Sequence, residues 1–263
     1  MFRIQKTALL CALIALAALL VLQPATAQII FSEDFEGSDP GWAPDNGGQI
    51  WEITPDFPNG TAGYLNTVEG CGNSGNTPIG FDNFSDGIIQ LEMSWGDDDS
   101  WGIVLRKTAD DAGYLVVFGY NETPSVIIAD LADGCADTGN CLDQVGCENG
   151  GNELLQVDHG LGADLTQDNS VSYTGRIEVI GDTIKVWYLP TADVASPTGD
   201  LGAPTVEFQT DGAHSGPGSV GVYQESQGNC MIDNVWVTGP GGLAPVEPQG
   251  KLAASWGRIK STY

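Results

Sequence analysis

Basic residues are scarce in this chain, and their scarcity excludes several kinds of partner. Lys and Arg number 9 among 263 residues against 35 Asp and Glu, and the formal net charge is −26. Between residues 28 and 250, where all the acidic residues lie, the only basic ones are Arg106, Lys107, Arg176 and Lys185. Such a surface repels nucleic acid and anionic membranes. We therefore expect no nucleic-acid partner, whereas divalent cations and neutral ligands are compatible with the charge.

The sequence also has no long apolar run after its first 27 residues. Residues 1–27 begin with Arg3 and Lys6, continue with an apolar stretch from about residue 8 to 22, and end in Ala-Thr-Ala. This order is typical of a cleaved secretory signal peptide. The apolar stretch is short for a membrane anchor, which is the alternative. We expect a secreted protein, extracellular or at the cell surface, with no membrane span after cleavage.

Cysteine and histidine are too few and too scattered for a zinc site. There is no C-x-x-C pair, and the two histidines are isolated. In an exported protein the cysteines are expected to form disulfides. Because five cysteines follow the leader, one thiol stays free or pairs with another chain. The disulfide candidates are Cys71, Cys135, Cys141, Cys147 and Cys230, of which three lie in a predicted long loop at about 132–156.

Helical periodicity is missing as well, and short alternating apolar runs take its place. Residues 88–95 put Ile89, Leu91 and Met93 on one face, and residues 101–106 alternate in the same way. The acidic Gly-Asp-Asp-Asp-Ser segment between the two runs predicts that they form a hairpin. A Gly-Asp turn predicts a second hairpin, which joins 175–180 to 183–188.

The remaining runs complete a chain of strands and define its boundaries. Ten or more short strands separated by turn residues indicate one all-β domain, a two-sheet antiparallel sandwich spanning 28–238. A Gly/Pro linker follows at 239–250, and the tail 251–263 carries three basic residues and no acid. The tail suits recognition by a sorting or anchoring partner, and a disordered end is the alternative. Further strands are expected at 28–36, 114–120, 126–130, 205–208, 219–223 and 231–237.

Several of these segments together resemble a known superfamily. They are residues 33–37 with Trp42 downstream, 99–106, 113–118, 176–179 with 184–187, and 218–222 closing on 232–235. In order and spacing they resemble the concanavalin A-like jelly-roll superfamily, which includes laminin-G-like, lectin and glucanase domains. The resemblance spans about 29–238 and implies a jelly-roll sandwich. It also implies a carbohydrate- or surface-associated extracellular role, often with a structural calcium ion.

Two acidic motifs at the ends of the domain are candidate calcium ligands. Asp34 and Glu36 lie near the end of the first predicted strand, and Asp233 lies on the last. The resemblance would place these strands side by side, and calcium takes six to eight oxygen ligands, many of them carboxylates. We therefore predict a structural calcium held by these three residues. The alternative is that they are solvated strand ends.

A polar face of one sheet is the candidate ligand-binding surface. Alternation places Gln90, Glu92, Arg106 and Trp187 on the polar faces of their strands. Aromatic rings stack on sugar rings, and charged groups hydrogen-bond sugar hydroxyls, so these four residues are the predicted binding residues for a glycan or another extracellular polymer. The alternative for Arg106 is a cross-strand ion pair with Glu92.

Signals of catalysis are weak. Retaining glucanases of this superfamily carry two carboxylates on an E-x-D-x-E strand, which this sequence lacks; Glu92 is the sole acid on its strand face, and no G-x-S-x-G occurs. We predict no catalytic residues and expect a non-catalytic, calcium-stabilised binding domain. A glycoside hydrolase of the same fold and a structural or anchored surface protein remain the alternatives.

Overall fold

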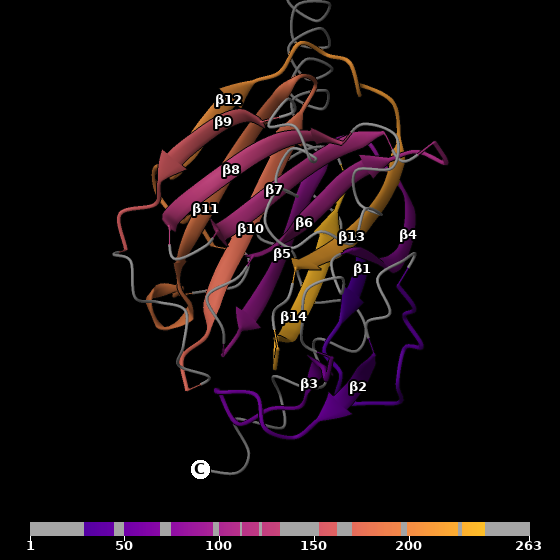
Figure 1. Ribbon diagram of the computed structural model, residues 1–263, viewed down its shortest axis with the longest axis vertical. Coiled ribbons are helices and arrows are strands. Elements are labelled where there is room, and N and C mark those ends of the chain that lie inside the picture. Colours follow the sequence, from indigo (N-terminus) through magenta and orange to yellow (C-terminus); the bar gives the residue numbers. More distant parts are fainter. Residues whose placement is uncertain are drawn as a thin grey trace, which may run out of the picture.

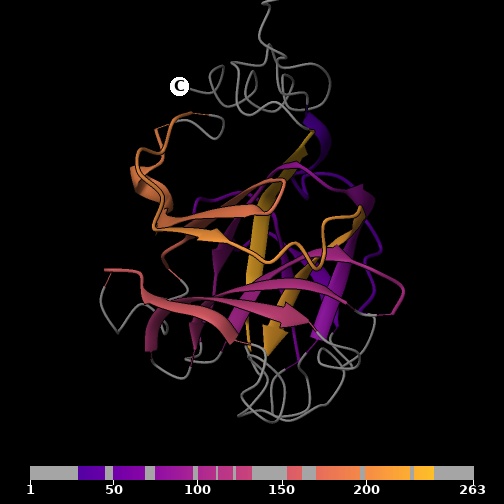
Figure 2. The same cartoon turned by 90° about the horizontal axis from the view of Figure 1, so that it is seen from above.

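The computed structural model is an antiparallel β-sandwich of two sheets (Figures 1 and 2). It describes residues 29–44, 50–68, 75–96, 100–110, 112–120, 123–131, 153–161, 170–195, 199–225 and 228–239. Within these ranges the one helical element is a single 3₁₀ turn, Thr191–Asp193, and no helix is long and apolar enough to cross a membrane. The predicted all-β, two-sheet class is confirmed.

The larger sheet, sheet A, contains both the first and the last described strands. Its order is β12-β11-β10-β5-β14-β3-β2, and β1 also pairs with β14. The prediction that the first and last strands lie together is thus confirmed, with Glu33 opposite Val235. The strands are β1 (Ile29–Glu33), β2 (Trp51–Thr54), β3 (Gly63–Asn66), β5 (Gly87–Ser94), β10 (Tyr173–Ile180), β11 (Thr183–Pro190), β12 (Val206–Gln209) and β14 (Met231–Thr238).

The smaller sheet, sheet B, has the order β4-β13-β6-β7-β8-β9. The prediction of a loop over 132–156 is wrong at its end, because residues from 153 onward form β9 and pair with β8; residues 132–152 lie outside the described residues. Leu155 and Val157 of β9 pack against the core from the sheet edge. The strands are β4 (Gly75–Phe84), β6 (Ser100–Lys107), β7 (Gly113–Tyr120), β8 (Thr123–Leu131), β9 (Glu153–Asp158) and β13 (Gly218–Glu225).

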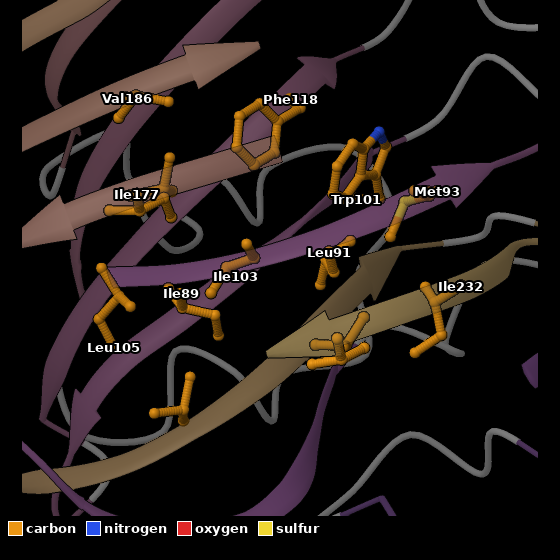
Figure 3. Packing of buried hydrophobic residues seen from close by; sticks show 14 of the residues in the cluster. Ile89, Leu91, Met93, Trp101, Ile103, Leu105, Phe118, Ile177, Val186 and Ile232 are labelled. Atoms are coloured by element: carbon orange, nitrogen blue, oxygen red, sulfur yellow. The ribbon is translucent and has the colours of Figure 1, made fainter. Parts of the chain in front are cut away.

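The core fills the space between the sheets with the residues that alternation selects. Ile89 and Leu91 of β5 face Ile103 and Leu105 of β6 across the sandwich (Figure 3). Burial of each such side chain contributes roughly 1.5–3 kcal/mol. At one end of the sandwich Trp101 stacks on Phe118 with 4.5 Å between ring centroids.

One of the two predicted hairpins is confirmed and the other is wrong. β10 and β11 pair in register from Tyr173↔Pro190 to Ile180↔Thr183. In contrast, β5 pairs with β10 and β14 in sheet A, whereas β6 pairs with β7 and β13 in sheet B. The alternation of both strands is as predicted. The chain between them crosses from one sheet to the other, so the two apolar faces meet across the core instead of lying side by side.

Sheet B is apolar on both of its faces. A second cluster of buried residues lies on the side away from the core, on strands β6, β7, β8 and β13. Strands that are buried on both faces read as continuous apolar runs, as 114–118 and 126–129 do. Because this cluster makes the outer face of sheet B apolar, the polar outer face of the sandwich is that of sheet A. Its members are Val104, Leu115, Val117, Ile127, Ala129, Leu131 and Tyr223.

Candidate functional site

The outer face of sheet A carries two neighbouring rows of polar side chains. Directly opposed residues on antiparallel strands share a face, so the registers define the rows. One row runs across β11, β10 and β5 through Trp187, Arg176 and Gln90. The other runs across β5 and β14 and pairs Glu92 with Asp233. Three of the four predicted ligand-binding residues are therefore brought together on this face.

The second row places two carboxylates opposite each other with little access to water. Asp233 is 1% exposed and Glu92 is 8% exposed. The Thr61 hydroxyl donates to Asp233 Oδ2 at 2.6 Å, and the Asn59 amide donates to Glu92 Oε2 at 3.3 Å. Within the described ranges no basic side chain forms an ion pair with either carboxylate. Glu92 is the sole acid on its own strand face, and its partner Asp233 comes from a strand far away in sequence.

Burial makes the charged form of this pair unfavourable. Desolvation raises the pKa of Asp233 to about 7, partly offset by the hydrogen bonds from Thr61 and Asn234. Desolvation also raises the pKa of Glu92 above its usual value. A buried carboxylate without a positive partner is costly. The pair is therefore balanced either by a proton near neutral pH or by a cation.

The predicted calcium ligands are only partly brought together. Glu36 Oε1 accepts the Ala62 backbone N–H at 2.9 Å, next to the Thr61 that contacts Asp233. Asp34 instead accepts the backbone N–H of Glu36. Across the described ranges, no three His, Cys, Asp or Glu side chains gather closely enough to hold a metal. A cation here would need hydroxyl, amide, backbone carbonyl or water oxygens as further ligands, which calcium accepts.

The first row opens into a hollow of about 340 Å³ on the outer face of sheet A. Arg176 lies at its base and is 2% exposed. Its Nε donates to Gln90 Oε1 at 2.6 Å, and its guanidinium carbon lies 5.6 Å from the centre of the Trp236 ring. Burial lowers the pKa of Arg176 to about 10, against the raising effect of Asp200 and Glu178. The arginine therefore keeps its charge at neutral pH. The hollow is lined by Ile88, Arg176, Glu178, Trp187, Asp200 and Leu201.

The segment at 199–202 forms one wall of this Arg176 hollow. Gly199 O accepts a hydrogen bond from Arg176 Nη1 at 2.7 Å, and Gly202 O accepts one from Trp187 Nε1 at 2.9 Å. Asp200 Oδ1 closes a local turn by accepting the Gly202 N–H. Trp187 thus lines the hollow, as expected of a ligand-binding residue. Gln90 is buried and orients Arg176.

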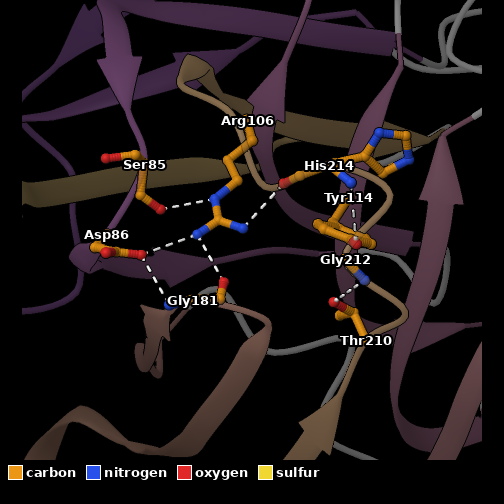
Figure 4. Close-up of polar contacts among 8 residues, drawn as sticks. All are labelled: Ser85, Asp86, Arg106, Tyr114, Gly181, Thr210, Gly212 and His214. Carbon is orange, nitrogen blue, oxygen red and sulfur yellow. Dashed lines mark hydrogen bonds and ion pairs between the residues drawn. The ribbon is translucent and has the colours of Figure 1, made fainter.

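Arg106 does not belong to this face, which corrects its prediction as a ligand-binding residue. It lies on β6 of sheet B, so a pair with Glu92 of sheet A does not form. Its buried guanidinium ties together three loops by donating to Ser85 O, His214 O and Gly181 O, and it pairs with Asp86 at 3.0 Å (Figure 4). Arg106 has φ of +53° beside a register shift between β6 and β13. This bulge turns the side chain away from the alternation that the sequence predicts.

Sequence reasoning missed Arg176, Glu178 and Asp200. The first two could have been found, because the confirmed hairpin places Arg176 opposite Trp187 and Glu178 opposite Lys185. Asp200 comes from a loop with no periodic signal. Of the disulfide candidates, Cys230 is a fully buried free thiol that lies 3.8 Å from Met93 Sδ, and the other four lie outside the described residues, as do the leader, most of the linker and the tail.

Solved structures share this architecture. A carbohydrate-binding module, CBM66, from Bacillus subtilis matches with a TM-score of 0.50 and 15% identity over 76% of this chain and 96% of that one. A Crh5 transglycosylase matches with a TM-score of 0.50 and 12% identity over 82% and 85%. An endo-1,3-β-glucanase catalytic domain from Thermotoga petrophila RKU-1 matches less well, with a TM-score of 0.42 and 11% identity over 81% and 98%. Neither a protein-family model nor a curated protein sequence matches the chain.

The likenesses to the carbohydrate-binding module and the transglycosylase establish the class of fold. The chain has the jelly-roll β-sandwich fold that the sequence resemblance predicts. A carbohydrate-binding module and a transglycosylase both have this fold. Since one fold hosts both binding and catalysis, the function has to be argued from the site.

Proposed function

We propose that the protein is a secreted carbohydrate-binding protein without hydrolytic activity, and that it binds its ligand on the outer face of sheet A. The Arg176 hollow is the observation that carries the proposal. It combines a tryptophan wall with charged hydrogen-bonding groups, the combination that binding sites use for orientation and specificity. The strongly acidic chain supports a neutral ligand over an anionic one.

A calcium ion beside the carboxylate pair is the second part of the proposal. Asp233 and Glu92 supply two buried carboxylates, and the Thr61 hydroxyl supplies a neutral oxygen; these are the hard donors that calcium prefers. Glu36 accepts the backbone N–H of Ala62, the residue after Thr61, and is the additional acid from the first motif. The ion would neutralise the two carboxylates and hold residues 59–62 against β14. Asp34 is not included, because its carboxylate accepts the backbone N–H of Glu36, two residues further along the chain.

The proposal that the protein does not hydrolyse its ligand rests on the burial and the hydrogen bonds of these two carboxylates. Glycosidases need two carboxyl groups that flank the scissile bond and reach the substrate. Glu92 and Asp233 are buried and engaged by Asn59 and Thr61. The two carboxylates therefore hold residues 59–61 in place and do not face a substrate.

Binding of the purified protein to a panel of polysaccharides and glycans, once with calcium and once with EDTA, tests the proposal. We expect binding to a defined neutral sugar class and a loss of about 10-fold or more for Trp187→Ala, since truncation of a tryptophan that anchors a ligand typically costs roughly 2 kcal/mol. Ile180→Ala is the control, because Ile180 is exposed at the β10–β11 turn.

Each part of the proposal can fail separately when reducing-sugar release and the unfolding temperature are measured in the same two buffers. Binding to none of the glycans in either buffer would overturn carbohydrate binding and favour a structural surface protein. Release of reducing sugar from a bound polysaccharide would overturn the non-catalytic role. An unfolding temperature that is the same in calcium and in EDTA would overturn the calcium site and leave carbohydrate binding standing.

A further inference from the structure

We infer that the Arg176 hollow recognises a single neutral, hydroxyl-rich sugar residue at a chain end, with Glu178 and Asp200 as the hydroxyl acceptors that determine specificity. This inference rests on the proposed function, because it assigns the ligand class of that same site. It follows from the size of the hollow, its charge and the way its walls are held.

The size of the hollow limits the ligand. Sites for drug-sized ligands occupy about 300–1,000 Å³, and the hollow, at about 340 Å³, lies at the lower end of this range. It is enclosed on one side by the 199–202 segment, whose Gly199 and Gly202 carbonyls are bound by Arg176 and Trp187. A single terminal residue fits such a hollow, whereas a long polysaccharide lying across the sheet needs an open groove.

The charges around the hollow select against ionic sugars. Arg176 supplies one positive charge at the base, and Glu178 and Asp200 supply two negative charges beside it. Lys185 lies 3.4 Å from Glu178 Oε1 and balances the remaining charge. A uronic acid would meet two carboxylates on a chain of net charge −26, and an amino sugar would meet Arg176 and Lys185. A neutral sugar instead places its hydroxyls against carboxylates that accept hydrogen bonds, which are strong when one partner is charged.

The hydrogen bonds to the 199–202 segment also hold the site in a binding geometry before any ligand arrives. Trp187 uses its indole N–H on Gly202 O, which fixes the ring orientation and leaves a ring face for stacking. Arg176 is fixed by Gln90 and by Gly199 O. Pre-ordered side chains lower the entropic cost of binding. The 199–202 segment is therefore part of the binding site and more than a connection between β11 and β12.

Titration of the purified protein with methyl glycosides tests the inference. The probes are a neutral hexoside of the class bound in the glycan panel, its uronic acid counterpart and its 2-amino counterpart. We expect the neutral glycoside to bind at least about 10-fold more tightly than either charged analogue. Glu178→Gln and Asp200→Asn should each weaken its binding by about 10-fold, the loss typical of a hydrogen bond to a charged group.

Glu207→Gln is the matched control, since Glu207 is an exposed acid opposite Lys185 on the neighbouring strand β12. Asp200→Asn keeps the side-chain oxygen that accepts the Gly202 N–H, and an unchanged unfolding temperature shows that the wall is intact. Tighter binding of the uronic acid, or full affinity in both hollow variants, would overturn this inference and leave carbohydrate binding elsewhere on the protein standing. Failure of every glycan to bind would instead overturn the proposed function itself.

Discussion

At the scale of single residues, Asp233 is the side chain on which burial and charge conflict most strongly. Its carboxylate is among the least exposed in the described residues, and it lies opposite another carboxylate, Glu92. Sequence reasoning selected Asp233 for its place in an acidic motif near the end of the domain. It could not pair Asp233 with Glu92, because 141 positions separate the two residues in the chain and strand register alone brings them together.

Asp233→Asn is expected to flatten the pH dependence of stability in EDTA. The folded-state pKa of Asp233 is raised to about 7, from an unfolded value near 3.9. The folded state therefore binds the proton more tightly, and this residue lowers the stability progressively as the pH rises from about 4 to 7. The full cost, on the order of 4 kcal/mol, applies above about pH 7.

Denaturant unfolding between pH 4 and 8 measures this effect as the difference between the two proteins. Glu207→Gln, an exposed acid on β12, is the control and should keep the wild-type profile. Asp233→Asn should gain stability over the wild type as the pH rises. Parallel profiles for the Asp233→Asn variant and the wild type would contradict the raised pKa.

At the scale of elements, β5 shows which part of a strand can be read from sequence. Its alternation, with Ile89, Leu91 and Met93 facing inward, is as predicted. Its partners are not, because β5 lies between β10 and β14 and not beside β6. Alternation is a property of one strand and of which of its faces is buried. Pairing depends on the sheet to which the chain returns after each strand, and that decides which strands become the neighbours of β5.

Gly87→Ala is expected to weaken the start of β5 and its contact with β14. Gly87 has φ of +144°, and an added Cβ would lie 2.0 Å from the Thr238 carbonyl oxygen. A strained backbone costs about 1–3 kcal/mol, and overpacking adds a similar amount. We expect a loss of roughly 3 kcal/mol, or about 10 °C in unfolding temperature for a domain of this size.

Gly216→Ala is the control for this substitution, because a Cβ there meets nothing within 4 Å. Thermal unfolding of both variants measures the difference. A Gly87→Ala protein that unfolds within about 1 °C of the Gly216→Ala protein would contradict the close approach of β5 and β14.

At the scale of the whole molecule, the net charge of −26 is a general source of repulsion in the folded state. Like charges on a compact body destabilise it, and salt screens them over a Debye length of about 10 Å at 0.1 M and 3 Å at 1 M. We expect the unfolding temperature to rise by several degrees between 0.05 and 1 M NaCl at pH 8 in EDTA.

Repetition of the salt series at pH 4 supplies the control for this prediction. Many of the carboxylates are protonated near that pH, so the repulsion and its response to salt should shrink. An equal salt dependence at both pH values would contradict charge repulsion as the cause.

The sequence by itself determined the class of fold, an acidic, all-β sandwich, and the inward faces of most strands. These features follow from composition and from alternation along single strands, which neighbouring residues encode. The tertiary structure alone decided that β5 and β6 lie in different sheets, that Arg106 is an internal tie and that Glu92 has Asp233 as its partner. Only the folded chain brings Asp200 and Trp187 to one hollow, since contacts between distant segments depend on sheet pairing and loop paths.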